Sequence, residues 1–214
     1  MRNYTVVLHH RYASYSSFRY AVACTASAKC SNTSAYNRYS HMYDAKTRDM
    51  NDQIPMHSAL EPLKWLVGTW RTEKPASGHF PTIEPFEYCE EINFSSIGQP
   101  MLNYTAQSWH PVKKCPMHRE VGFLKITPKT NDVSLLLTHN FGLCTVEEGC
   151  VTDHEIVLKS TSISRKTGPY KAPAVLEIKR EFKLVGDALH HTLHMATEKT
   201  TELTPHLEAV YKKQ

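Results

Sequence analysis

Short runs of β-branched and aromatic residues predict an all-β protein, an antiparallel up-and-down β-barrel of about ten strands with a short N-terminal helix. Turn signals such as 97–100, 130–132 and 185–187 separate these runs along the 214-residue chain. Several runs alternate apolar and polar residues, which is the period of a half-buried strand. We expect a closed barrel because closure removes the sheet edges that invite aggregation.

A short helix is expected just before the first strand. Ser58 followed by Glu61 matches the capping-box pattern, in which a serine accepts from free backbone N–H groups at the helix start. Leu60, Leu63 and Leu66 recur at helical spacing and predict one buried face. A helix of this kind would serve as a plug over one end of the barrel.

The strands are expected near ten segments, bounded by the turn signals: 68–73, 84–95, 100–109, 117–127, 132–139, 142–148, 154–164, 174–185, 188–197 and 204–213. A barrel of about eight strands already has room for a small ligand, so ten strands should enclose a cavity. The fold class is therefore a lipocalin- or fatty-acid-binding-protein-like barrel, and its natural ligand would be apolar.

Period-two alternation predicts which side chains face that cavity. In one strand the inward row is expected to be Val133, Leu135, Leu137 and His139. In another it is expected to be Leu189, His191, Leu193 and Met195. A methionine in such a row is more often ordinary core than a ligand contact, so Met195 could have either role.

Residues 1–57 differ in composition from the predicted barrel at 58–214. They contain no acidic residue before Asp44 and show no sustained period. The segment is expected to be a disordered extension or a mitochondrial-transit-like leader, and a start codon placed upstream of Met50 or Met56 would look the same. A cytoplasmic location is favoured, with the mitochondrion as the alternative.

Composition excludes several classes of partner. The formal net charge is +4 without a basic block, so nucleic acid is not expected. No apolar run approaches the roughly 18 residues of a membrane-spanning helix. The six cysteines are expected to be reduced thiols, although Cys144 and Cys150 leave a metal or disulfide interpretation open. Whether the chain is a monomer or a homodimer is left open.

Five segments resemble motifs of the nitrobindin family, which includes the nitrobindin domain of THAP-domain proteins, and they occur in the same order along the chain. They are Gly68–Trp70, Phe80–Tyr88, Pro116–Leu124, Met195–Thr197 and Leu203–Ala209. The chain from about Ser58 to its end thus resembles a nitrobindin. The spacing of Cys24 and Cys30 does not match the zinc-binding THAP module, so DNA binding is not implied.

The resemblance implies a ferric haem b protein that isomerises peroxynitrite to nitrate and binds nitric oxide. His206 matches the family's iron ligand, and the resemblance places five further residues near haem: Thr82, Met117, His118, His139 and Met195. His118 is in addition the candidate hydrogen-bond donor to the substrate anion. Two alternatives stay open, a non-enzymatic carrier of an apolar ligand and a haem-based nitric oxide sensor.

Three departures from expectation accompany the resemblance. Arg71–Lys74 lacks the later glycines of the family's glycine–tryptophan motif, and His139 stands where some relatives carry an amide. Strict alternation would also place His206 on the outer face with Glu208 and Lys212. Proline favours irregular strand positions, so Pro205 is expected to absorb that conflict.

Overall fold

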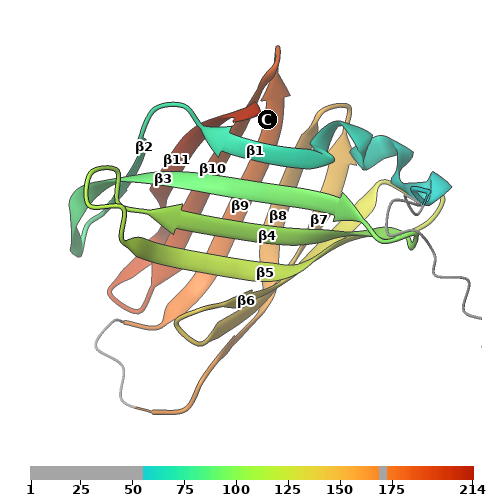
Figure 1. The fold of residues 1–214 in the computed structure, drawn as a ribbon. Helices are drawn as coiled ribbons and strands as arrows, with labels where there is room; N and C mark the ends of the chain where they lie inside the picture. Colours follow the sequence, from blue (N-terminus) through green and yellow to red (C-terminus); the bar gives the residue numbers. More distant parts are fainter. Residues whose placement is uncertain (1–54, 169–172) are drawn as a thin grey trace, which may run out of the picture. The chain divides into compact units, whose positions relative to one another are not determined.

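The computed structural model describes residues 55–168 and 173–214 (Figure 1). Residues 1–54, which make up nearly all of the predicted extension, lie outside this description. The described elements are the 3₁₀-helix η2 (Ser58–Leu66) and eleven strands: β1 (Gly68–Thr72), β2 (Ala76–Phe80), β3 (Ile83–Ser96), β4 (Met101–Trp109), β5 (Pro116–Ile126), β6 (Asp132–His139), β7 (Leu143–Thr152), β8 (Glu155–Arg165), β9 (Val175–Val185), β10 (Ala188–Thr197) and β11 (Thr200–Lys213).

The strands form one closed antiparallel sheet, which confirms the predicted fold class. Consecutive strands from β3 to β11 pair with one another, and β1 and β2 each pair with both β3 and β11. The two short strands therefore share one position, so eleven strands make a ten-position barrel. The sequence did not predict β2, because it has only five residues and contains Gly78.

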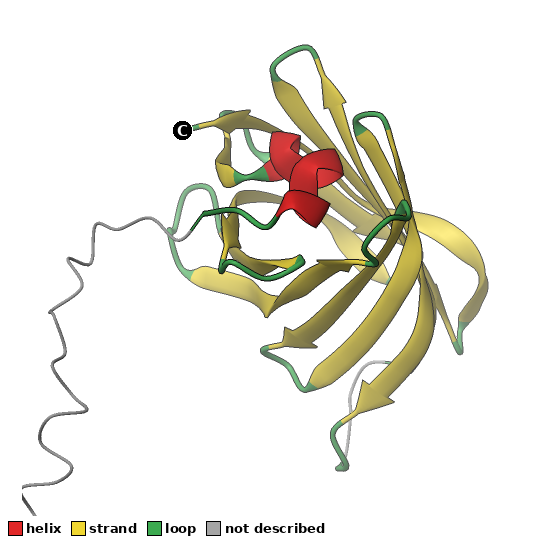
Figure 2. Ribbon diagram, turned by 90° about the vertical axis from the view of Figure 1, so that its right-hand side faces the viewer, coloured by secondary structure: helices red, strands yellow, loops and turns green. Residues whose placement is uncertain are grey.

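The predicted helix is present, but its predicted cap is wrong. The N-cap is His57, whose Nδ1 accepts a hydrogen bond from the Ala59 backbone N–H at 3.1 Å. A 3₁₀-helix has three residues per turn, so Leu60, Leu63 and Leu66 lie on one line. All three are fully buried against the barrel interior. Figure 2 shows this helix across one opening of the barrel, as a plug would lie.

Apolar side chains fill the end of the barrel beneath η2, which we call the closed half. Its core packs η2 against inward residues of several strands, among them Trp70, Phe94, Leu124, Leu135 and Phe182. The inward row predicted for β6 is confirmed, since Val133, Leu135, Leu137 and His139 are all buried. The inward row of β10 is confirmed for Leu189, His191 and Leu193, while Met195 is partly buried.

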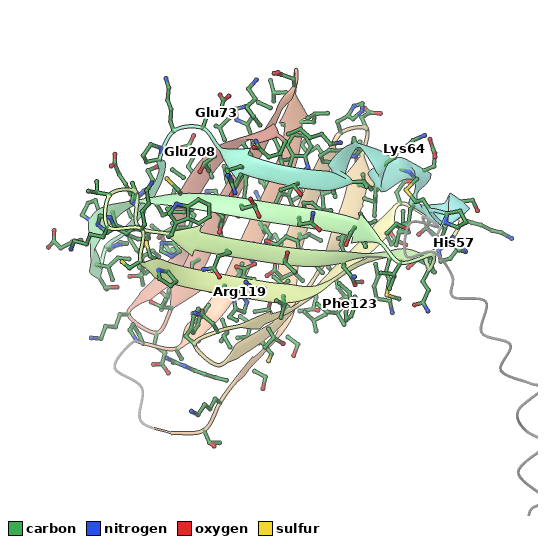
Figure 3. All side chains as sticks on the ribbon, viewed as in Figure 1. His57, Lys64, Glu73, Arg119, Phe123 and Glu208 are labelled. Carbon is green, nitrogen blue, oxygen red and sulfur yellow. The ribbon has the colours of Figure 1, made fainter. Side chains whose placement is uncertain are left out.

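The outer face of the sheet carries the alternate side chains. Arg119 and Phe123, labelled on β5 in Figure 3, are both exposed. The four cysteines within the described ranges, Cys89, Cys115, Cys144 and Cys150, are free thiols, which confirms the prediction for these four. Cys24 and Cys30 lie outside the described residues. Across those same ranges, no helix has the length and apolar character needed to cross a membrane.

Candidate functional site

A cavity of about 230 Å³ occupies the half of the barrel away from η2. Much of its wall is apolar and includes Leu143, Ile178, Leu193 and Met195. Met117 and Phe141 also line it and are 38% and 54% exposed, so the cavity reaches the surface beside them. This cavity half and the closed half are built from the same strands.

A β-bulge in β11 turns His206 into the cavity. Leu193 of β10 pairs with Leu207, but the next residue, His194, pairs with Pro205, which leaves His206 as the extra residue. A bulge places two successive residues opposite one partner and re-aims a side chain. His206 and Leu207 consequently both line the cavity. The irregularity predicted at Pro205 is confirmed.

The short strand β2 holds the His206 ring. Its Nδ1 lies 3.0 Å from the backbone oxygen of His79 and must donate, since a carbonyl oxygen only accepts. The lone pair of the neutral ring is then on Nε2. Burial lowers the pKa of His206, although the His79 carbonyl acts in the opposite direction. A neutral imidazole with a free Nε2 is the form that binds a metal ion.

Two aromatic rings flank His206 and fix its plane. Phe80 and Phe86 meet it edge-on, with ring centroids 5.6 and 6.3 Å away. Phe86 reaches this place by crossing Gly78, where an added Cβ would lie 2.2 Å from the phenyl ring. Gly78 therefore permits the close approach that positions Phe86 beside the histidine.

The cavity floor contains buried polar and ionisable side chains, which we call the polar layer: Glu90, Tyr104, Glu120, Glu147, Arg180, His191 and Tyr211. Arg180 is 1% exposed and donates to both carboxylate oxygens of Glu147, from Nε at 2.9 Å and Nη2 at 3.3 Å. It also lies 3.3 Å from Glu120 Oε2, which accepts from the Tyr104 hydroxyl at 3.1 Å. One guanidinium therefore faces two carboxylates.

The charge balance of this floor depends on Glu120. Burial by itself raises the pKa of Glu120, but Arg180 and the His118 hydrogen bond outweigh it and hold that pKa well below its usual range. Glu120 is therefore ionised at neutral pH. With Glu147 also facing Arg180, the floor has more negative than positive charge unless a further cation or proton is present.

A second chain of hydrogen bonds connects Arg180 to Glu90. Arg180 Nη1 lies 3.4 Å from His191 Nε2, His191 Nδ1 lies 3.4 Å from the Tyr211 hydroxyl, and that hydroxyl donates to Glu90 Oε2 at 2.5 Å. Burial raises the pKa of Glu90 to about 7, against the opposing hydrogen bond from Tyr211. Burial and Arg180 lower the pKa of His191 to about 3. His191 is thus neutral and accepts from Arg180.

His118 and His139 lie where the floor meets the cavity wall. His118 Nε2 is 3.2 Å from Glu120 Oε1 and 3.2 Å from His139 Nδ1. His139 Nδ1 is itself 3.5 Å from the same carboxylate oxygen. Burial lowers the pKa of His139 to about 4, which keeps this ring neutral at physiological pH. Both rings contact Phe141.

The cavity brings together most of the residues that the sequence singled out. His206, Met117, His118, His139 and Met195 all line it. Thr82 does not: it is exposed in the turn between β2 and β3, so its contact with haem stays a prediction.

Sequence reasoning missed His79 and every member of the polar layer except His191, which it placed on an inward row. The charged members of the polar layer could have been found as charged residues at the inward-facing positions of a strand. Arg180, between Ile178 and Phe182 on the inward row of β9, is an example. His79 acts through its backbone, so no side-chain pattern could have revealed it.

The site fits a haem group in its donor chemistry. An apolar wall suits a porphyrin, and the neutral His206 imidazole with its Nδ1 hydrogen engaged by a carbonyl is the arrangement that holds a proximal histidine. The cavity also opens to the surface, as a group with ionised propionates requires.

Comparisons with known proteins agree with this interpretation. "Peroxynitrite isomerase THAP4" of Rattus norvegicus is 45% identical over 159 residues, which cover 74% of this chain and 28% of that protein. "Peroxynitrite isomerase Rv2717c" of Arabidopsis thaliana is 37% identical over 161 residues, covering 74% and 91%. The chain therefore spans just over a quarter of the first relative and most of the second.

A solved structure and a family profile give the same result. The structure of Rv2717c from M. tuberculosis matches with a TM-score of 0.65 and 33% identity, over 75% of this chain and 99% of that one. The profile described as "THAP4-like, heme-binding beta-barrel domain" matches residues 59–213. The resemblance to nitrobindins is confirmed, and the chain belongs to the family of THAP4-like haem-binding β-barrel domains.

Proposed function

We propose that this chain binds ferric haem b through His206, isomerises peroxynitrite to nitrate and binds nitric oxide. The observation that carries the proposal is the bulged His206 in the cavity wall, with Nδ1 engaged by the His79 carbonyl. Family membership accounts for haem, and the names of the relatives from rat and Arabidopsis supply the reaction.

His206 would bind iron through Nε2, and its surroundings favour that role. The His79 carbonyl sets the tautomer and makes the imidazole a stronger donor. Phe80 and Phe86 prevent the ring from rotating out of the cavity. The iron ligand would thus be oriented before haem binds.

The polar layer supports the ferric state. Glu120 and Glu147 face the single guanidinium of Arg180, which leaves excess negative charge near the cavity. Negative charge and neutral imidazole ligation both favour the more highly charged form of iron. Bound ferric haem would supply a Lewis-acidic iron, the chemistry that this isomerisation requires.

His118 is the proposed hydrogen-bond donor to the peroxynitrite anion, with a restriction. Its Nε2 lies 3.2 Å from Glu120 Oε1, and a carboxylate can only accept, so that hydrogen is already engaged. Substrate would have to compete with Glu120 for it. The apolar wall formed by Leu193, Met195 and Leu207 excludes water and confines the reactants.

The test is His206→Ala. The purified variant, reconstituted with ferric haem, should lose the five-coordinate absorption spectrum and the acceleration of peroxynitrite decay measured by stopped flow. His190→Ala is the matched control, since His190 lies on β10 but does not line the cavity. Retention of the ferric spectrum in His206→Ala would show that another residue ligates the iron.

Stopped flow also separates the proposed enzyme from a sensor. A haem-loaded protein that binds nitric oxide but leaves the rate of peroxynitrite decay unchanged would be a sensor or a haem carrier. Nitrate must be the product of the accelerated decay, because nitrite would indicate a different reaction.

A further inference from the structure

Three potential metal ligands lie close together on the cavity wall, on strands other than the one that carries His206. They are His118 and Glu120 on β5 and His139 on β6. His118 and Glu120 are two residues apart, so both face the barrel interior, and His139 pairs with Glu120 in the sheet. Adjacent strands thus place two imidazoles and one carboxylate on the same patch.

Their donor atoms form a triangle of nearly equal sides. The Nε2 of His118 is 3.2 Å from Glu120 Oε1 and 3.2 Å from His139 Nδ1, and the third side is 3.5 Å. Zinc binds nitrogen and oxygen at about 2.0–2.1 Å in a tetrahedron, so two of its ligands lie about 3.4 Å apart. The triangle therefore already has the size of one face of a zinc tetrahedron.

Hydrogen bonding alone satisfies this triangle poorly. If only one of the two ring nitrogens carries a hydrogen, that hydrogen can point along one side of the triangle only. If both do, two N–H groups face each other across the 3.2 Å between His118 Nε2 and His139 Nδ1. The carboxylate can accept but not donate. A cation above the triangle would interact with all three lone pairs at once.

The surroundings supply the charge and the orientation that such a site needs. Glu147 binds the Arg180 guanidinium at two positions, which offsets the charge that Arg180 presents to Glu120. Tyr104 and Arg180 Nη1 hold the other Glu120 oxygen, Oε2, while Oε1 faces the histidines and accepts one longer hydrogen bond, at 3.4 Å, from Arg180 Nη2. Hydrogen bonds of this kind orient carboxylate ligands in metalloproteins.

We propose that His118, Glu120 and His139 bind a divalent transition metal ion, with Zn²⁺ as the best-fitting species, at a site separate from His206. Two histidines and one glutamate are a ligand set found in zinc enzymes, where the fourth position holds water. All three residues line the cavity, so the fourth position faces the space in which a substrate would lie. A bound metal would take the place of the hydrogen on His118 Nε2, so with metal present its Lewis acidity would replace the hydrogen-bond donor role proposed for His118.

The test uses the full, tag-free chain without haem, stripped with a chelator and titrated with Zn²⁺ by calorimetry. Co²⁺ serves as a spectroscopic probe, because tetrahedral Co²⁺ gives intense visible bands. We expect a Zn²⁺ site that is lost in both His118→Gln and His139→Gln, with the Co²⁺ bands lost in parallel. His190→Gln is the matched control and should bind like the unmodified chain.

His206→Ala distinguishes this site from the haem site and should retain Zn²⁺ binding. Equal binding in His118→Gln, His139→Gln and the unmodified chain would overturn the proposal, as would loss of binding in His206→Ala. Circular dichroism establishes that each variant is folded. The histidine variants avoid replacing Glu120, whose loss would leave Arg180 without one of its buried partners. Failure here leaves the haem proposal intact, since that depends on His206.

Discussion

The closed half and the cavity half of the barrel use the same strands but bury different kinds of side chain. Phe182 of β9 packs in the apolar core, while Arg180, two residues earlier on the same inward row, lies among carboxylates. The closed half is sealed by three leucines of η2. The cavity half has no such plug among the described residues and instead holds the polar layer at its floor. The barrel thus buries apolar side chains towards one end and charged side chains towards the other.

The largest expected effect comes from Arg180→Met. Removal of one partner from a buried ion pair leaves uncompensated charge, here on Glu120 and Glu147, and should lower the free energy of unfolding by about 3–5 kcal/mol. Urea denaturation measures this loss. Lys179→Met, the neighbouring and more exposed cation, should change stability by no more than about 0.5 kcal/mol.

Leu135→Ala in the closed half sharpens the comparison with Arg180→Met. It should cost about 2–5 kcal/mol through the cavity that it creates, without a change in haem affinity. If Arg180→Met lowered the free energy of unfolding by less than about 1 kcal/mol, Glu120 and Glu147 would have to take up protons readily. The contrast between a charged cavity half and an apolar closed half would then disappear.

The next largest effect is a pH dependence of the free energy of unfolding, which arises from Glu90 in the cavity half. Because the folded pKa of Glu90 is raised from 4.5 to about 7, the fold binds the proton more tightly than the unfolded chain does. Ionisation of Glu90 therefore removes stability as the pH rises from about 4.5 to 7. Relative to the unmodified chain, Glu90→Gln should gain about 2–3 kcal/mol between pH 5 and pH 8.

The difference in unfolding free energy between Glu90→Gln and the unmodified chain separates the contribution of Glu90 from those of the histidines. His139 and His191 have lowered pKa values, about 4 and about 3, so each favours the fold above its unfolded pKa and opposes it as the pH falls below about 6.5. These contributions cancel in the comparison. A flat Glu90→Gln difference would place the Glu90 carboxyl in water.

The smallest effect is expected from Gly78→Ala. Its Cβ would collide with Phe86, which flanks His206, so the imidazole should lose part of its orientation. Haem affinity should fall about 10-fold, in the range of other supporting interactions around metal ligands. Haem transfer to apomyoglobin measures it, with Ser77→Ala on the same strand as control. An unchanged affinity would assign the ring's orientation to Phe80 and His79 alone.

Local patterns predicted much of this fold because they report burial directly. The row from Val133 to His139 alternates as a half-buried strand must, and the leucines of η2 recur at the spacing of one buried face. The cap of η2 escaped prediction since a histidine side chain replaced the expected serine. Strand β2 escaped because five residues with a central glycine have too little periodicity to detect.

The sequence by itself determined the barrel, the inward rows and, through resemblance, His206 as the iron-ligand candidate. Only the tertiary structure decided that the His206 ring faces the cavity, because a one-residue bulge reverses the face that alternation assigns. Tertiary structure also decided the partners of Arg180, which come from three strands, with Glu120 on β5, Glu147 on β7 and His191 on β10. Charge pairs of this kind depend on closure of the whole barrel, and no local sequence pattern encodes them.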